Sequence, residues 1–372
     1  MPWQTGAYGV SLHIVTDTGD RKTWLINHPD ATQTTRECLN EIQCYFDTYA
    51  VAVAHNLKFD LHWLHHYGIN FNDIECHCTL LAEYFLEGHA IKMQDLSLND
   101  LAAKRGFPPK FDKVKEYWDA GMETDEVPAD ILTEYGEHDA DLALQIYQQQ
   151  MPEILKANMK MLCILEMESL KAFQEMEANG MLLDVKLLKQ FHKEFEEELE
   201  ALDEWLCEAL GIDNISSGDQ LSCGLFGGTL QVDGRVPGKR EGTTRKGKVP
   251  KDYKGAGFKP LAEWRLKKDG MYSTSIDTIL QLTPRSKMHK AIKEKLIERS
   301  RKDQLNKTYF KGLLSRVSDE GYVHCNLNQV ITKTGRLSCS NPNLQNIPRG
   351  DTGPVKRAFI SRFTEPEDDI PY

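Results

Sequence analysis

The sequence predicts an α/β domain followed by a mostly α-helical region, with a return to short strands near its end. Three observations lead to this division. Short apolar runs separated by turn residues dominate the first 56 residues. Apolar residues then recur at helical spacing beyond residue 152. After Gly321 the pattern changes to short extended pieces such as YVHCNLNQV. Because strands come first and helices follow, we expect a first domain of about 150 residues.

The first domain opens with two strands, GVSLHIV and KTWLIN, on either side of a turn at TDTGD. A helix-like stretch, TTRECLNEIQCYFDTY, leads to a third strand, VAVAHN, and a helical pattern then runs from Asp60 to His66. Further helices are predicted at CTLLAEYFL and at SLNDLAAKRG, where Ser97 is the expected N-cap and Gly106 the stop. The long amphipathic stretch ADILTEYGEHDADLALQIYQQQM completes the domain.

The helical region contains two long helices separated by a basic segment. Leucine and phenylalanine recur at helical spacing between residues 187 and 210, so this stripe is expected to pack against a neighbour. The second helix is predicted at HKAIKEKLIERSRKDQLNKTYFKGLLSRV. Between them, residues 235–268 hold twelve Lys or Arg and three acids, a net charge of +9 in a chain of net charge −11. This Gly- and Pro-rich segment predicts a mobile basic loop. Phosphate tracking is favoured over a merely solvated surface because so few acids interrupt it.

Composition excludes several classes of protein. The chain has 372 residues, 27% charged and 40% hydrophobic, which is typical of globular proteins rather than disordered ones. It contains no run of about 18 apolar residues and no signal-peptide pattern, so no membrane partner is expected. Nine cysteines without a C-x-x-C pair indicate free thiols in a reducing cytoplasm. Cys76-His77-Cys78 is therefore interpreted as thiols rather than as a metal cluster.

Two acidic residues in the first domain are candidates for chemistry. Asp60 lies at a strand-to-helix junction, where a carboxylate can face a cleft. Asp139 follows Tyr135 by four residues, so both project from one face of a helix. Carboxylates suit hard divalent cations, and Tyr135 could aim an attacking water. Taken alone, each acid also fits a helix cap or a solvated charge.

Two motifs in this domain resemble those of a known family. AHNLKFDL looks like the second motif, and YGEHD the third, of the 3′–5′ proofreading exonuclease domain of family A DNA polymerases. The resemblance implies a ribonuclease-H-like fold and Mg²⁺ or Mn²⁺ held by Asp60 and Asp139. It also implies single-stranded 3′ ends as substrate, and Asn56 matches the family's Asn in the second motif.

The first motif of that family, Asp-x-Glu on the opening strand, has no counterpart in this sequence. The nearest string is Asp17-Thr18-Gly19, and its position between two strands indicates a hairpin turn rather than a metal ligand. GAYGVSLHIV looks like the family's second strand. We therefore expect an exonuclease domain without its first strand, with part of its metal site absent and a strand edge left open.

The late stretch VITKTGRLSCSNPNLQNIPRG, residues 330–350, resembles the block that family A polymerases carry just ahead of their first catalytic palm motif. Such a block suits the minor groove of a duplex, because Arg336 can donate to groove acceptors that vary little with sequence. The amides of Asn343, Gln345 and Asn346 can donate or accept there. A turn-rich surface loop would account for NPN alone but not for the whole block.

Upstream segments resemble the same family. NISSGDQLSCGLF resembles a thumb segment, MYSTSIDTILQL an element after the thumb tip, and VKRAFISRF the strand that leads into the palm. NKTYFKGLL matches the Thr-Tyr at the end of the next helix, where Gln304 replaces a common Lys. The resemblance implies DNA contacts at four residues of these segments: Ser273, Thr274, Lys307 and Thr308.

The resemblance implies a DNA-directed DNA polymerase with a proofreading domain, acting in replication by two-metal phosphoryl transfer. We expect the exonuclease domain at 1–152, the helical thumb at 153–322 and the start of the palm at 323–372. The palm's catalytic aspartates are not found on this chain, so deoxynucleotides are expected as ligands only if a second chain, such as a C-terminal polymerase fragment, completes the palm. The alternative is a catalytically incomplete subunit or remnant that binds primer–template DNA. A cytoplasmic location, in bacteria or phage-infected cells, is expected in either case.

Overall fold

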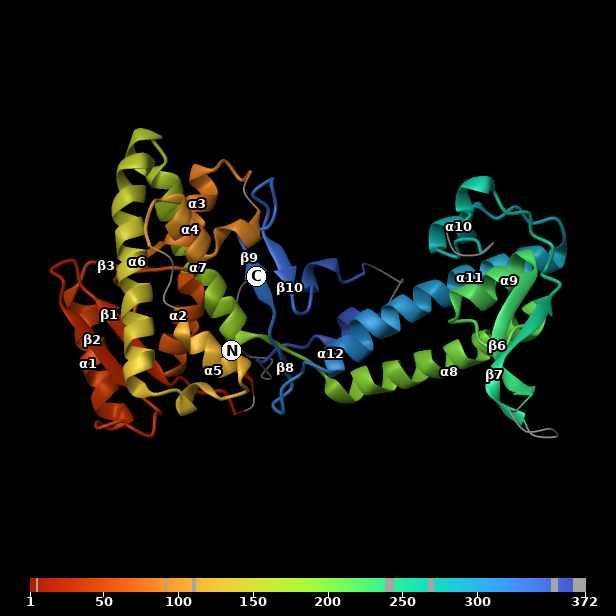
Figure 1. Cartoon of the computed structure of the whole chain (residues 1–372), viewed down its shortest axis with the longest axis horizontal. Coiled ribbons are helices and arrows are strands. Elements are labelled where there is room, and N and C mark those ends of the chain that lie inside the picture. The colour runs from red at the N-terminus through yellow and green to blue at the C-terminus, as the bar shows by residue number, and fades with distance from the viewer. Residues whose placement is uncertain are drawn as a thin grey trace. The chain divides into compact units, whose positions relative to one another are not determined.

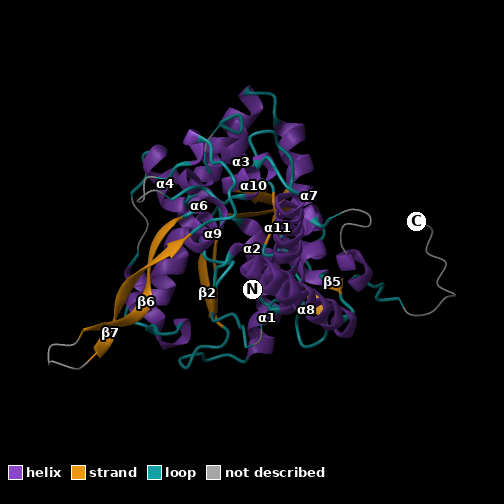
Figure 2. Cartoon of the chain, turned by 90° about the vertical axis from the view of Figure 1, so that its right-hand side faces the viewer, coloured by secondary structure: helices purple, strands orange, loops and turns teal. Residues whose placement is uncertain are grey.

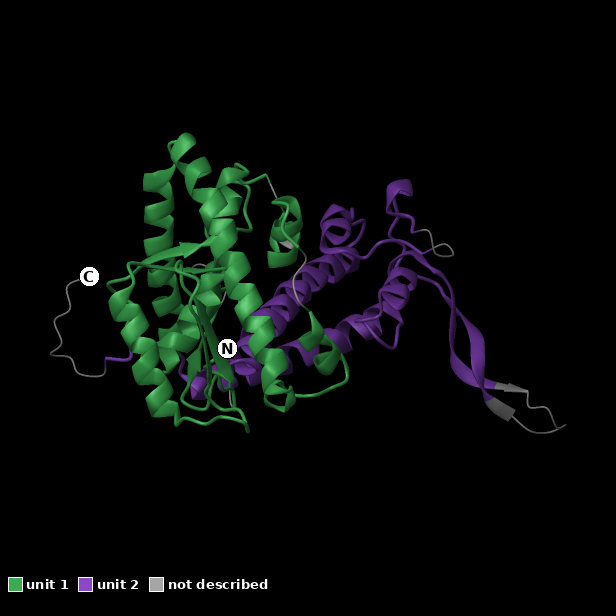
Figure 3. Ribbon diagram, turned by 60° about the vertical axis from the view of Figure 1, so that its left-hand side comes forward, with its two compact units in different colours: residues 1–182, 317–346 green, residues 183–316, 347–372 purple. Residues whose placement is uncertain are grey.

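The structure, a computed structural model, describes residues 1–4, 6–90, 92–108, 112–237, 244–266, 271–348 and 354–363. The chain forms two compact units, coloured separately in Figure 3. Unit 1 comprises Met1–Leu182 and Val317–Asn346, and unit 2 comprises Leu183–Arg316 and Ile347–Tyr372. Among the described residues, no helix is long and apolar enough to cross a membrane.

Unit 1 begins with the predicted strand–turn–strand. β1 (Ser11–Val15) pairs antiparallel with β2 (Arg21–Leu25), and Gly19 in the connecting turn has a positive φ of 89°. A Gly at such a position closes a tight turn without steric cost. Asp17 lies in this turn and is exposed. The hairpin prediction at TDTGD is therefore confirmed.

A second small sheet is formed by β3 (Val51–Ala54) and β4 (Glu75–Cys78), which run parallel. Parallel neighbours need a crossover, and α2 (Leu57–His66) provides it. Within the described residues, β1–β2 and β3–β4 are separate two-stranded sheets. All four residues of β3 are only half-buried.

Helices lie around these strands, as Figure 1 shows. Local chemistry sets several of their ends: Thr34 and Glu37 form a capping box at α1, and the Ser97 hydroxyl accepts from the Asp100 N–H at α4, as predicted. α6 continues through Pro152, so the predicted domain boundary falls inside a helix. The remaining elements of unit 1 are α1 (Thr35–Thr48), α3 (Thr79–Leu86), η1 (Met93–Leu96), α4 (Leu98–Lys104), α5 (Lys113–Asp119), η2 (Thr124–Glu126), α6 (Ala129–Lys156), α7 (Lys160–Asn179), β5 (Met181–Leu182), β8 (Tyr322–Val323), β9 (Asn326–Asn328), β10 (Ser338–Ser340) and η5 (Leu344–Asn346).

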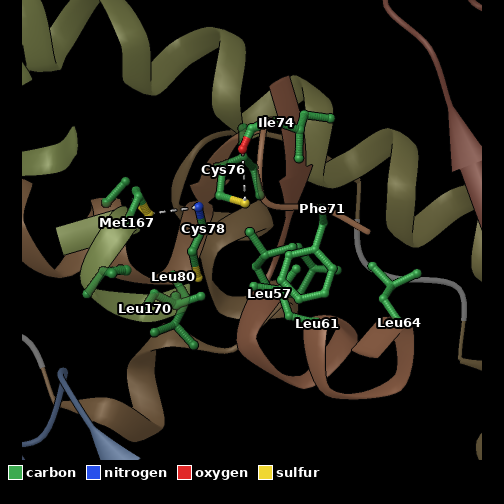
Figure 4. Packing of buried hydrophobic residues seen from close by; sticks show 14 of the residues in the cluster. Leu57, Leu61, Leu64, Phe71, Ile74, Cys76, Cys78, Leu80, Met167 and Leu170 are labelled. Atoms are coloured by element: carbon green, nitrogen blue, oxygen red, sulfur yellow. Dashed lines mark hydrogen bonds between the residues drawn. The ribbon is translucent and has the colours of Figure 1, made fainter. Parts of the chain in front are cut away.

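The core of unit 1 packs α2, β4, α3 and α7 against one another. Figure 4 shows Leu57 and Leu61 of α2 in the same cluster as Met167 and Leu170 of α7. Complete burial of a side chain such as Leu61 contributes about 2 kcal/mol. Cys76 and Cys78 are buried in this cluster, and neither forms a disulfide. The core thus fixes α2, the helix that carries Asp60.

Unit 2 is built on two long helices that lie side by side, α8 (Val185–Leu210) and α11 (Lys287–Leu305) (Figure 1). Six residues of the predicted stripe on α8 are buried: Leu188, Phe191, Leu199, Leu202, Leu206 and Leu210. Arg299 of α11 donates to Asp203 of α8 at 2.5 Å. The other elements of this unit are α9 (Gly218–Phe226), β6 (Gly228–Pro237), β7 (Thr244–Tyr253), η3 (Ala262–Trp264), α10 (Ile276–Gln281), the π-helix η4 (Asn306–Lys311), α12 (Gly312–Leu314) and η7 (Pro354–Ala358).

The basic segment differs from the sequence-based expectation. A loop is predicted for residues 235–268, but residues 228–237 and 244–253 form the antiparallel pair β6–β7 (Figure 2). Ten cross-strand pairs hold the two strands in register, from Gly228↔Tyr253 to Pro237↔Thr244. Gly, Pro and Lys have low strand propensity, so the sequence does not predict strands in this segment. The ribbon is stabilised instead by pairing between its two strands.

Candidate functional site

The end of β3 leads directly into the helix that carries Asp60. Asn56 joins the two in the left-handed conformation, with φ 59° and ψ 41°, which Asn tolerates better than most residues. Asn56 is exposed, and its side chain forms no capping hydrogen bond to α2. Asp60 follows in the first turn of α2.

α2 is anchored from the side away from Asp60 by a buried carboxylate. Glu177 of α7 lies 2.6 Å from the Lys58 Nζ and 2.7 Å from the His62 Nε2. The backbone N–H of Leu327 also donates to Glu177. Burial alone would raise the pKa of Glu177, but these hydrogen bonds and the Lys58 charge hold it below its usual value. Lys58 and His62 lie two residues before and two residues after Asp60, so they project from the opposite face of α2. Their contacts with Glu177 therefore fix the rotation of α2 about its own axis.

Asp60 and Tyr135 line one cavity of about 510 Å³ in unit 1. The aromatic side chains of Phe59 and Trp63 lie on the same wall as Asp60. Burial raises the pKa of Asp60 to about 7, because little solvent or positive charge stabilises its ionised form. The structure thus brings together two of the three predicted catalytic residues.

The third predicted catalytic residue lies one helical turn beyond Tyr135. Asp139 is half-buried on α6, and its side chain does not line the cavity. Tyr135 packs edge-on against Trp118, with ring centroids 6.1 Å apart. Across the part of the chain that the structure describes, no group of three or more His, Cys, Asp or Glu side chains could hold a metal ion. Asp60 and Asp139 alone therefore do not make a complete site for a cation that prefers six oxygen ligands.

His13 of β1 is a cavity residue that sequence reasoning missed. Its ring nitrogens lie 2.8 Å from the Ser11 hydroxyl and 3.0 Å from the Thr23 hydroxyl. Burial lowers the pKa of His13 to about 4, so the ring is neutral at pH 7. A Cβ added at Gly136 would lie 2.1 Å from this ring. Gly136, the second residue of YGEHD, therefore allows β1 to contact α6. In the sequence, only the alternating pattern of β1 could have indicated His13. That pattern does not show which residue of the strand contacts α6.

The late sequence block forms an exposed turn with a fixed base. The Gly335 N–H donates to the Thr332 carbonyl at 2.9 Å, and Gly335 has a φ of 69°. The Tyr84 hydroxyl donates to the same carbonyl at 2.6 Å, which ties the turn to α3. Arg336 is exposed, as are Lys333 and Asn343. The block can therefore meet a ligand without rearrangement of the core.

The amides that follow are also exposed. Gln345 and Asn346 lie in η5, and the Gln345 N–H donates to the Asn343 side chain at 3.2 Å. This contact is the local capping role that NPN alone would suggest, and it leaves the Asn343 amide N–H₂ able to donate elsewhere.

The four predicted DNA contacts of unit 2 occupy two separate places. Ser273 and Thr274 precede α10, and the Ser273 hydroxyl accepts from Thr278 at 3.1 Å within a Ser/Thr network. Lys307 and Thr308 are exposed on the π-helical turn η4. Such turns are frequent at functional sites, and the sequence predicts only an ordinary helix there. Lys307 pairs with Asp303 at 2.8 Å.

Comparison with protein families divides the chain into two matched segments. Residues 16–155 match the model of a 3′–5′ exonuclease, and residues 185–366 match the model of DNA polymerase family A. The first segment contains the cavity residues Asp60 and Tyr135, and the second contains Arg336.

Curated relatives are similar to large parts of this chain. DNA polymerase I of Chloroflexus aurantiacus is 28% identical over 316 residues, which cover 83% of this chain and 30% of that protein. DNA polymerase I of Rhizobium leguminosarum is 28% identical over 325 residues, 85% of this chain and 28% of the relative. DNA polymerase I of Geobacillus stearothermophilus is 34% identical over 189 residues, which cover 50% of this chain and 18% of that protein. The chain thus spans less than a third of the length of these relatives.

A solved structure has a similar fold. The polymerase domain of Pol1 from M. smegmatis, in complex with DNA primer-template and dNTP, matches with a TM-score of 0.68 and 21% identity over 94% of this chain and 52% of that chain. The solved structure shows a shared fold, and the two matched segments correspond to parts of a DNA polymerase that has a 3′–5′ exonuclease domain. The matches to both family models and to the DNA polymerase I relatives support a fragment of a family A DNA polymerase.

Proposed function

We propose that this chain binds the primer–template DNA of a replicative DNA polymerase and receives unpaired 3′ ends in its exonuclease cavity. The polymerase and 3′–5′ exonuclease matches support an enzyme and do not favour the alternative of an incomplete DNA-binding subunit or remnant. The bacterial relatives support a bacterial origin. A phage-infected host and a cytoplasmic location remain part of the proposal.

One observation carries the DNA-binding proposal. Arg336 lies exposed on a turn whose base is fixed by the Tyr84 hydrogen bond. A guanidinium held in this way loses little conformational freedom when it contacts a groove acceptor. The exposed amides of Asn343, Gln345 and Asn346 follow within ten residues and extend the same polar surface. We assign further contacts with the DNA backbone to five residues: Asn56, Ser273, Thr274, Lys307 and Thr308.

Asp60 and Asp139 are proposed to contribute to a site for Mg²⁺ or Mn²⁺, with Tyr135 beside it. The support is chemical, because carboxylates offer oxygen ligands, and Asp60 lines an aromatic-walled cavity that can hold a base while Asp139 lies one turn beyond the cavity residue Tyr135. The described residues bring no third acidic or imidazole ligand to them. Further ligands are therefore required before this site can hold a cation firmly.

The proposal includes the division of the chain into three segments: the exonuclease domain at 1–152, the thumb at 153–322 and the start of the palm at 323–372. Deoxynucleotides are proposed as ligands only together with a second chain, such as a C-terminal polymerase fragment, that completes the palm.

Substitution of Arg336 by Ala tests the groove contact. We expect the affinity for a primer–template to fall about tenfold, by nearly the same factor for two unrelated sequences, because minor-groove acceptors vary little. Fluorescence anisotropy with labelled duplexes measures it. Arg36→Ala, which removes an exposed arginine from α1 of the same unit, is the matched control. Equal affinities of the Arg336→Ala and Arg36→Ala variants would contradict the proposal.

A further inference from the structure

The ribbon β6–β7 of unit 2 has two chemically different faces. Cross-strand partners in an antiparallel pair point to the same side. One face carries Leu230, the pair Val232↔Val249 and the buried Tyr253, and its root packs on the core of unit 2. The other face is exposed at every described position and carries most of the ribbon's charge. The ribbon extends away from the helices of its unit (Figure 2).

Two cations lie directly opposite each other on the exposed face. Arg235 pairs with Lys246 in the ladder, and both side chains are exposed. Like charges in this position destabilise a strand pair. Lys248, two ladder positions closer to the root on the same face, forms an ion pair with its cross-strand partner Asp233 at 2.8 Å. Among the described residues, the ion pairs of the ribbon are made by Lys248 and Lys251, and none involves Arg235 or Lys246. Their repulsion would be relieved by an anion bound across the two strands.

The dimensions of the ribbon fit a DNA groove. Two strands about 4.8 Å apart make a ribbon narrow enough for the major groove of a duplex, which is about 12 Å wide. Ten residues per strand give a length of about 34 Å, close to one duplex turn. A two-stranded ribbon is only marginally stable alone, so a surface that covers it also stabilises it.

We propose that the β6–β7 ribbon is a duplex-DNA-binding element that lies along a groove of the primer–template, with Arg235 and Lys246 against backbone phosphates. This inference rests on the proposed function, because it requires that the chain bind a duplex. The sequence alone predicts phosphate contacts for the whole basic segment 235–268. The structure narrows this prediction to two residues, Arg235 and Lys246. The net charge of the chain, −11, makes such local positive surfaces necessary for binding of a polyanion.

Neutralisation of the opposed pair tests the proposal. The double variant Arg235→Gln/Lys246→Gln should weaken binding of a labelled duplex and reduce the slope of log K against log salt by about 1.8, at 0.9 per phosphate contact. Arg235→Lys should retain most of the affinity. The affinity for a single strand of the same length should change less, because a single strand has no groove. Lys193→Gln/Lys290→Gln removes two exposed cations from α8 and α11 of the same unit and is the matched control.

The outcomes separate this inference from the proposed function. If the unchanged chain binds no duplex at low salt, both fail. If it binds, and the ribbon variant keeps the affinity and slope of the control variant, only the ribbon assignment is overturned. Thermal unfolding of each variant checks the fold. Removal of a like-charge repulsion should leave the melting temperature unchanged or slightly higher.

Discussion

At the residue scale, Asp60 is presented by three features that lie on different elements. Asn56 in its left-handed conformation turns the chain out of β3, Glu177 holds the opposite side of α2, and Gly136 lets β1 approach α6 beside the cavity. Asn56 and Asp60 are visible in the sequence as a motif. Glu177 is not, because it lies more than a hundred residues away in a helix whose pattern reads only as packing.

Removal of the Asp60 carboxylate should abolish Mn²⁺ binding to this chain. We expect Asp60→Ala to lose any saturable Mn²⁺ signal in an electron paramagnetic resonance titration, because it removes one of the two carboxylates proposed to hold the cation. The titration is best made at about pH 8, since burial raises the pKa of Asp60 to about 7 and the carboxylate must be ionised. Asp17→Ala, an exposed acid in the β1–β2 turn, should bind as the unchanged chain does. Mn²⁺ binding by the Asp60→Ala variant would refute the site.

At the scale of elements, local chemistry was predictable and tertiary pairing was not. The turn at TDTGD and the Ser97 cap follow from residues within a few positions of each other. The ribbon β6–β7 depends on pairs separated along the chain, and its strands lack the usual strand-forming residues. Likewise the cavity combines residues of β1, α1, α2 and α6, which no single stretch of sequence places together.

The contact between α2, α7 and β9 gives an element-scale prediction. Glu177→Gln should lower the free energy of unfolding by about 3 kcal/mol, because it leaves Lys58 and His62 without their buried counter-charge. Glu175→Gln, an exposed acid on the same helix, should change it by less than about 0.5 kcal/mol. Urea unfolding at pH 7 measures both.

The pH dependence provides a second check on the same contact. The pKa of Glu177 is lower in the folded chain than its usual value, so its stabilising contribution is present at neutral pH and is lost as the pH falls through the folded pKa. The difference between the unchanged chain and the Glu177→Gln variant should therefore narrow at acidic pH. A difference that is equally large in acid would show that the contact acts through packing alone.

At the scale of the whole molecule, one chain joins an exonuclease-type α/β unit to segments of a polymerase. The order of the segments, the two matched family models and the similar fold agree on this point. The sequence motifs predicted the family because TGRLS and YGEHD carry specific residues at fixed spacing. The division into compact units follows the core instead: α7 packs with the strands of unit 1, and residues 317–346 return to that unit.

Binding of primer–template DNA by the unchanged chain tests the central claim most directly. The measurement is a set of equilibrium titrations of a labelled primer–template between about 50 and 200 mM salt, with two unrelated sequences. We predict that log K falls linearly with log salt with a slope of about −4 or steeper, and that the two sequences bind within about threefold of each other. No binding at the lowest salt, or a slope near zero, would contradict the account.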